Sequence, residues 1–103
     1  MKRILIMYDL STLNTRHRRL ANQFRKMIIS YGFIMLTESC YTRALKSLES
    51  CNYLLMKIKK KLPKQGQIQW LVINETAFCR MEYLIGEPSK NIELQMKGYI
   101  EIE

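Results

Sequence analysis

Asp9 is the residue of this chain best placed to do chemistry. Five apolar or aromatic residues, 4–8, run directly into it, and the next acidic residue is Glu38. A carboxylate at the carboxyl end of a buried strand can ligate Mg²⁺, which accepts one or two carboxylates together with waters and substrate phosphate. Such a metal could activate water against a phosphodiester. The alternative is that Asp9 turns or caps the following loop, and from the residues alone that alternative is favoured.

Basic side chains follow Asp9 on a segment with helical spacing. The residues that lie off its apolar stripe include Arg16, Arg18, Arg19, Arg25 and Lys26. Arg18 and Arg25 would share one outer row, and Arg19 and Lys26 the next. Arginine binds phosphate in a forked geometry, so Tyr8 with Arg18 and Arg19 could hold phosphates. A lysine-rich run at 57–64 is more simply a solvated face.

Phosphate contacts supply affinity without reading sequence. Aromatic residues that could stack on unpaired bases are sparse, because Phe24 and Tyr31 fall on the buried row of the same helix. We therefore expect binding to a duplex backbone rather than to a single strand.

The charge of the chain points in the same direction. The net charge is +8 and the pI is near 9.6, which suggests a polyanionic partner such as nucleic acid. The alternative is a basic surface that binds nothing, which is common among small proteins. Residues 1–64 hold 14 Lys and Arg against 3 acidic residues, whereas residues 65–103 hold 3 against 6. The positive field is thus placed on particular elements.

Other site types have little support. The three cysteines show no CxxC spacing and His17 is the only histidine, so one chain cannot assemble a zinc site. Asp9 interrupts the first apolar run, which is too short for a secretory signal, and no later stretch has the length to span a bilayer. We interpret the chain as a cytoplasmic protein with reduced thiols and no membrane partner.

The apolar patterns predict a definite order of elements. A buried strand at 3–8 precedes a helix at about 14–31, ended by Gly32. Two short strands at 33–36 and 39–45 follow, then a helix capped by Ser47 and a strand at 67–73. A helical turn at 75–79 and a further strand at 80–86 come next. The order strand, helix, strand, strand, helix, strand predicts an α+β fold, the ferredoxin-like βαββαβ sandwich.

Beyond that core lies a surplus, NIELQMKGYIEIE. Ile92, Leu94 and Met96 alternate with polar residues, which predicts an amphipathic edge strand. Such a strand must pair with something, and a second copy of the chain is one candidate. We therefore divide the chain into a core domain, 1–87, and a C-terminal strand extension, 88–103, that docks on the partner subunit.

Three stretches in register resemble one family. ILIMYDLST resembles the first strand of the small CRISPR-associated protein Cas2, which ends in an aspartate. FRKMIISYGFIMLTESCYTR resembles that family's helix-to-hairpin segment, and VINETAFCRMEYLIGE its last core strand, short helix and following strand. The second and third of these stretches are most similar to members from type II CRISPR systems. One departure is Ser11, where family members often have proline.

The resemblance implies a homodimer whose C-terminal strand docks on the partner's sheet. It also implies binding of double-stranded DNA and assembly with the CRISPR integrase Cas1 during spacer acquisition. Many members are assigned metal-dependent endonuclease activity on RNA or DNA, which is dispensable for spacer capture in the family at large. By this resemblance Asp9 becomes the catalytic residue and the ligand of Mg²⁺, with one metal site shared at the dimer axis.

Several function classes stay open at this point. The first is a dimeric DNA-binding adapter of CRISPR adaptation, and the second is a magnesium-dependent endonuclease. An endoribonuclease toxin of the virulence-associated D type shares the fold. A ferredoxin-like interaction module without a nucleic-acid role is the last, and the basic N-terminal part argues against it.

Overall fold

The first strand of the chain, β1 (Lys2–Asp9), lies at the centre of the sheet. The structure, a computed structural model, describes the backbone of residues 1–102 and the side chains of residues 1–96. The remaining elements are α1 (Thr15–Ser30), β2 (Ile34–Thr37), β3 (Cys40–Leu45), α2 (Leu48–Lys59), β4 (Gln67–Asn74), α3 (Glu75–Cys79) and α4 (Lys90–Ile102). The strands form one sheet in the order β2-β3-β1-β4, and every pairing is antiparallel. This is the predicted ferredoxin-like α+β arrangement.

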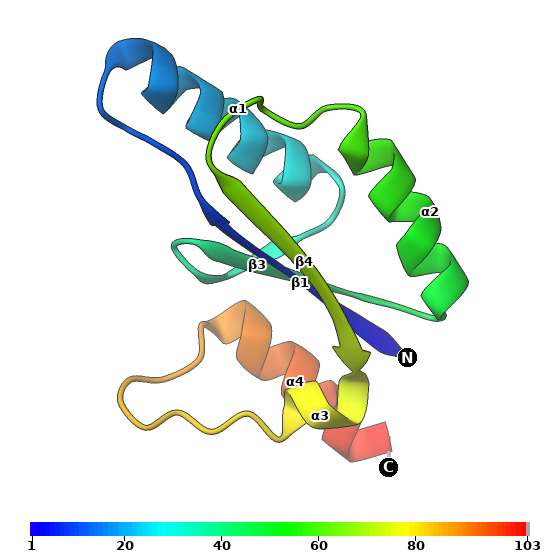
Figure 1. The fold of residues 1–103 in the computed structure, drawn as a ribbon. Coiled ribbons are helices and arrows are strands. Elements are labelled where there is room, and N and C mark those ends of the chain that lie inside the picture. The colour runs from blue at the N-terminus through cyan, green and yellow to red at the C-terminus, as the bar shows by residue number, and fades with distance from the viewer. Residues whose placement is uncertain (103) are drawn as a thin grey trace.

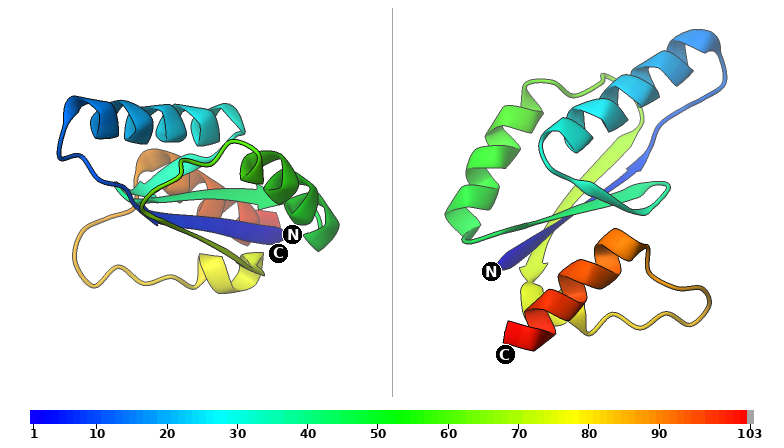
Figure 2. Two further views of the ribbon diagram at one scale, coloured as in Figure 1. Left: turned by 45° about the horizontal axis from the view of Figure 1, so that its top comes forward. Right: turned by 180° about the vertical axis from the view of Figure 1, so that it is seen from behind.

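The helices α1 and α2 cover one face of the sheet, while α3 and α4 lie on the other side (Figures 1 and 2). Asn14 caps α1 by accepting a hydrogen bond from the His17 backbone N–H at 2.8 Å. Ser47 caps α2 in the same way from Ser50 at 3.1 Å. Gly32 has φ 87°, the left-handed conformation that ends a helix, as expected of glycine after α1. Local capping therefore sets where both helices begin.

The main core lies between the sheet and α1 and α2. Alternate residues of β1, among them Ile4 and Ile6, point into it, since successive side chains of a strand face opposite ways. Its buried members are Ile4, Ile6, Phe24, Ile28, Phe33, Tyr41, Cys51, Leu54 and Ile58. Ile68, Trp70 and Val72 of β4 pack against this cluster, which confirms the face predicted from their alternation.

A buried ion pair fastens the second face of the sheet. The Arg3 guanidinium donates to both carboxylate oxygens of Glu75 at 2.9 and 2.8 Å, and it lies 4.0 Å from the ring centre of Phe78. A third N–H donates to Gln95 of α4 at 2.7 Å. Arg3 and Glu75 are 1% and 4% exposed. Because a buried charge is tolerated only when it is paired, Arg3 ties α3 and α4 to the central strand.

Two predicted strands are absent from the described sheet, and both predictions are wrong for this chain. Residues 81–89 form no regular element, and Leu84 and Ile85 are 91% and 94% exposed. The expected C-terminal strand is instead the helix α4, whose start is capped by Ser89. A helix places Ile92 and Met96 on one face, so the same alternating letters satisfy helical spacing. Ile92 is fully buried within its own chain. Docking of residues 88–103 on a partner stays a prediction, and Glu103 lies outside the described residues.

Two further expectations concern thiols and membranes. Burial raises the pKa of the Cys40 and Cys51 thiols, which keeps both in the unreactive thiol form at neutral pH. Among the helices of the described residues, none combines the length and the apolar character needed to cross a bilayer.

Candidate nucleic-acid and metal site

Asp9 stands exposed at the last position of β1, paired in register with Gln67 of β4. The turn before β4 packs closely against the backbone of Asp9. Gly66 has φ 84°, and a Cβ there would lie 2.6 Å from the Asp9 carbonyl oxygen and 2.6 Å from a Leu10 methyl group. Only glycine accommodates this conformation and this approach together. The backbone of Asp9 is therefore fixed on one side, while its carboxylate faces solvent.

The possible co-ligands of the Asp9 carboxylate decide which metal it could hold. Within the described residues, no group of three His, Cys, Asp or Glu side chains lies together as a metal cage would require. Mg²⁺ needs less than a cage, because it keeps several waters and binds through one or two carboxylates. One exposed carboxylate per chain fits such a sparse site, and a second copy could supply the second carboxylate.

Tyr8, predicted to contact nucleic acid, is largely a core residue. Its ring packs edge-on against Phe24 at 5.1 Å and stacks with Tyr41 at 6.1 Å, between ring centres. The hydroxyl donates to the Glu38 carbonyl at 3.4 Å. Burial, followed by the neighbouring Tyr41, raises the pKa of Tyr8 to about 12. Tyr8 is thus a neutral phenol at physiological pH. Its hydroxyl can form a hydrogen bond, but it cannot act as a general base.

The loop between β1 and α1 is closed by its own hydrogen bonds. Ser11 Oγ and His17 Nδ1 lie 2.8 Å apart, and Ser11 Oγ also accepts from the Leu13 backbone N–H at 3.3 Å. Arg18 folds back to donate to the Thr12 carbonyl at 3.2 Å. The sequence offered no signal for the Ser11–His17 pair, because neither residue belongs to a motif with fixed spacing. The pair holds the segment that follows Asp9.

The predicted basic rows of α1 flank a shallow groove of about 430 Å³, which we call the α1 groove. Its lining residues are Thr15, Arg18, Arg19, Asn22, Gln23 and Lys26. The structure thus brings together three of the predicted phosphate-binding cations. Arg16 lies instead in a smaller hollow of about 230 Å³ with His17 and Lys64. Arg25 does not line either hollow, and its charge acts to lower the pKa of Tyr8 against the larger effect of burial.

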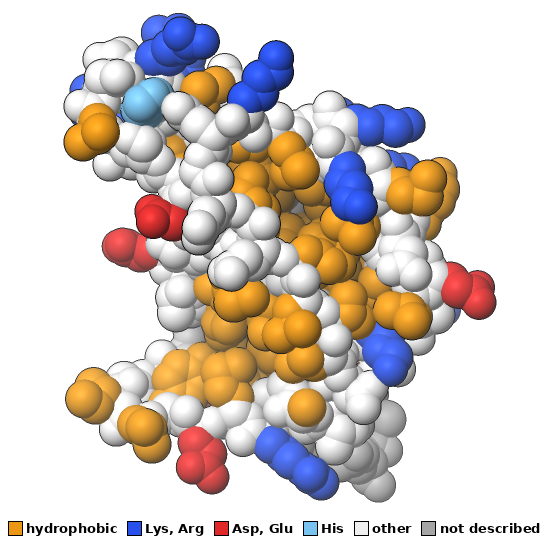
Figure 3. Space-filling model, in the orientation of Figure 1, with side chains coloured by type: hydrophobic (Ala, Val, Ile, Leu, Met, Phe, Trp, Pro, Cys, Tyr) orange, Lys and Arg blue, Asp and Glu red, His pale blue; other side chains and the backbone are white. Residues whose placement is uncertain are grey.

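The electrostatics around α1 favour an anion. The helix contains no acidic residue from Thr15 to Ser30, so nothing on it neutralises the arginines. Its N-terminal backbone N–H groups add positive potential at the same end. Figure 3 shows Lys and Arg side chains along the upper and right-hand margins, where α1 and α2 lie, although an acidic side chain is also visible on the right-hand margin. This distribution matches what a polyanion-binding face requires.

A four-stranded sheet of this order, with a lone carboxylate ending its central strand and an acid-free basic helix beside it, defines a small ferredoxin-like protein suited to a polyanion. Comparison with known proteins gives the family. The model of CRISPR associated protein Cas2 matches residues 1–81, so the chain belongs to that family.

Named relatives agree with this assignment. A protein of Campylobacter jejuni named CRISPR-associated endoribonuclease Cas2 is 38% identical over 84 residues, which cover 82% of this chain and 59% of the relative. Relatives with the same name from Streptococcus mutans and Lacticaseibacillus rhamnosus are 34% and 31% identical. Each of these two matches covers 87% of this chain, with 83% and 89% of the relative respectively.

Proposed function

We propose that this protein holds double-stranded DNA, as a homodimer, for the CRISPR integrase Cas1 during spacer acquisition. The observation that carries the proposal is the α1 groove, where Arg18, Arg19 and Lys26 lie together on a helix without acids. Such a groove neutralises phosphates of any sequence. That property suits a protein that must hold many different DNA segments.

The homodimer part of the proposal rests on two unsatisfied surfaces. Within the described chain β4 pairs only with β1, so its outer edge keeps unpaired backbone groups that can accept another strand. Figure 3 shows apolar side chains gathered over this side of the sheet, and Leu71 on β4 is 47% exposed. The segment at 81–87 is irregular and exposes Leu84 and Ile85. Pairing of that segment with β4 of a second copy would bury both surfaces.

A second candidate function is a metal-dependent endonuclease acting on RNA or DNA. It is favoured by the exposed carboxylate of Asp9 and by the endoribonuclease named in the relatives. Asp9 of each copy would hold Mg²⁺, which supplies charge neutralisation at the phosphate and an activated water. The fixed backbone at Gly66 and the Ser11–His17 pair would keep Asp9 and its loop in place.

Duplex binding is tested by charge reversal in the α1 groove. Arg19 and Lys26 are suitable, because both are exposed and neither caps the helix. The double variant Arg19→Glu with Lys26→Glu should weaken binding of unrelated duplexes alike, by roughly ten-fold or more at moderate salt. Lys59→Glu on α2, equally exposed but outside the groove, is the control and should change affinity far less. Equal binding by the double variant and the control would contradict the proposed role of the groove.

A further inference from the structure

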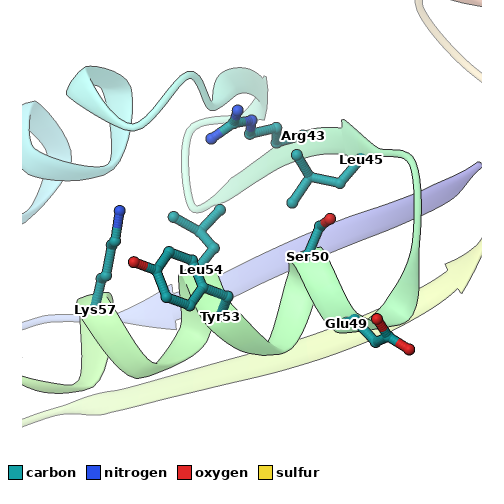
Figure 4. A pocket seen from close by; sticks show the side chains of 7 residues that line it. All are labelled: Arg43, Leu45, Glu49, Ser50, Tyr53, Leu54 and Lys57. Carbon is teal, nitrogen blue, oxygen red and sulfur yellow. The ribbon is translucent and has the colours of Figure 1, made fainter.

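A second hollow of about 430 Å³ lies between β3 and α2, and Asp9 is not among the residues that line it. Figure 4 shows its lining, which consists of Arg43, Leu45, Glu49, Ser50, Tyr53, Leu54 and Lys57. We call it the α2 pocket. Its lining combines apolar side chains, an aromatic ring and cations, whereas the lining of the α1 groove contains no aromatic ring.

The cations of the α2 pocket share one end. In Figure 4 the Arg43 guanidinium and the Lys57 ammonium both lie at the end away from the start of α2, whereas the Glu49 carboxylate lies at the opposite end and points outward. Arg43 is held in place by an N–H that it donates to the Tyr31 carbonyl. Close by, the Lys61 ammonium donates to the Tyr31 hydroxyl at 3.0 Å. This end of the pocket therefore attracts an anion and the other end does not.

An aromatic platform stands beside these charges. Tyr53 is 64% exposed, unusual for a ring on a packed helix, and the Lys57 ammonium lies 4.6 Å from its ring centre. Leu45 and Leu54 supply apolar surface next to the ring. A flat, partly apolar group with a phosphate attached matches this set: its ring would lie against Tyr53 and its phosphate would meet Lys57 and Arg43.

We propose that the α2 pocket binds an unpaired nucleotide, such as the single-stranded end of a DNA duplex. Stacking on an exposed aromatic residue with a cation nearby is how sequence-tolerant proteins hold single strands. From the sequence we expected backbone binding alone, because the aromatic residues of α1 are buried. Tyr53 lies on α2, and its exposure beside two cations becomes visible only when β3 and α2 are packed together. The proposal extends DNA binding to a site separate from the α1 groove.

The test compares two DNA probes by fluorescence anisotropy: a blunt duplex, and the same duplex with four-nucleotide single-stranded tails. The native protein should bind the tailed duplex more tightly. Tyr53→Ala should abolish this preference, with a loss of about five-fold to a hundred-fold for the tailed duplex, and leave blunt-duplex binding unchanged. Tyr53→Phe keeps the ring and should keep the preference. Met56→Ala, on the same helix, 63% exposed and outside the pocket, is the matched control.

A second measurement uses deoxyadenosine monophosphate as the probe, titrated into the full-length protein and followed by NMR. Amide shifts should change at Tyr53, Lys57 and Arg43, and Lys57→Gln should reduce them. Equal affinity for the two duplexes, or a preference that survives Tyr53→Ala, would overturn the proposal. The proposal would also be overturned if the monophosphate left these amides unshifted. A protein partner would then be the better candidate for the pocket. Loss of all duplex binding in Arg19→Glu with Lys26→Glu concerns only the α1 groove, so the two proposals fail separately.

Discussion

Asp9 combines a fixed backbone with an exposed carboxylate, and this combination allows a substitution that changes chemistry without changing fold. Asp9→Asn keeps the size of the side chain and removes its charge. Because an amide is a poorer ligand for a hard cation, we expect magnesium-dependent cleavage to fall by a factor on the order of a hundred or more. Duplex affinity should stay within about two-fold, since it rests on the α1 groove.

The measurement is cleavage of RNA and DNA with and without chelator, alongside a binding titration. Cleavage that persists in Asp9→Asn and in chelator would remove this residue from the mechanism. Loss of folding in the variant would instead support the alternative that Asp9 serves the turn into the following loop.

Tyr8 gives a prediction for alkaline pH. Its pKa is raised to about 12, chiefly by burial, while an unfolded tyrosine titrates near 10. The folded state therefore holds this proton more tightly. The resulting stabilisation is complete below about pH 10 and is lost as the pH rises through 12. Tyr8→Phe keeps the ring contacts with Phe24 and Tyr41 but has no proton to lose.

We expect the free energy of unfolding of the native protein to fall more steeply between pH 10 and 12 than that of Tyr8→Phe. Urea unfolding at several pH values measures both, and absorbance of tyrosinate follows the titration directly. Parallel decline in the two proteins would show that Tyr8 is not the group responsible.

At the scale of elements, the irregular segment after α3 offers the sharpest test of dimerisation. Leu84 and Ile85 are almost fully exposed in the described chain, an arrangement that is costly in water unless a partner covers them. Leu84→Asp with Ile85→Asp should weaken the dimer by at least ten-fold in sedimentation, because two charges would enter an apolar interface. The thermal stability of the monomer should change little.

Leu13→Asp is the matched control for the element prediction. Leu13 is 88% exposed in the loop before α1 and lies outside the proposed interface. A double variant that self-associates as tightly as this control would contradict the assignment of the segment to the interface. Deleting α4 would be a poorer test, because Ile92 is fully buried in its own chain.

The elements also show what the sequence could and could not reveal. The start of α2 was predictable because the Ser47 cap is a local signal. The basic rows that line the α1 groove were predictable for the same reason, since they need only helical spacing. Residues 92–96 were misread because Ile92 and Met96, two of the three alternating apolar positions, are also one helical turn apart, while Leu94 is exposed. Such a choice is made by packing against the rest of the fold.

Long-range contacts were beyond sequence reasoning. In the sequence Arg3 is one of two adjacent basic residues near the N-terminus, yet its carboxylate partner, Glu75, is 72 positions away. The α2 pocket likewise depends on β3 and α2 meeting in space. Neither arrangement leaves a periodic pattern, because each joins residues from separate elements.

For the whole molecule, the measurable property is how binding depends on salt. A dimer that neutralises about six phosphates should show log affinity falling with log salt at a slope of about −5. Reversing Arg19 and Lys26 should flatten the slope by about one unit for every phosphate that the variant no longer neutralises. Titrations at four or more salt concentrations give this number, and a slope near zero would exclude a mechanism based on phosphate neutralisation.

The central place of β1 has a consequence for how the protein is made. This strand is synthesised first, but its two neighbours, β3 and β4, are complete only at Leu45 and Asn74. At typical translation rates the chain therefore spends several seconds, up to roughly fifteen, with Ile4 and Ile6 unable to enter a finished sheet. β1 can pair with β3 once Leu45 has been made, but its other edge, along which β4 pairs, stays open until Asn74. The pairing of β1 with β4, which completes the sheet, can therefore form only after Asn74 has been synthesised.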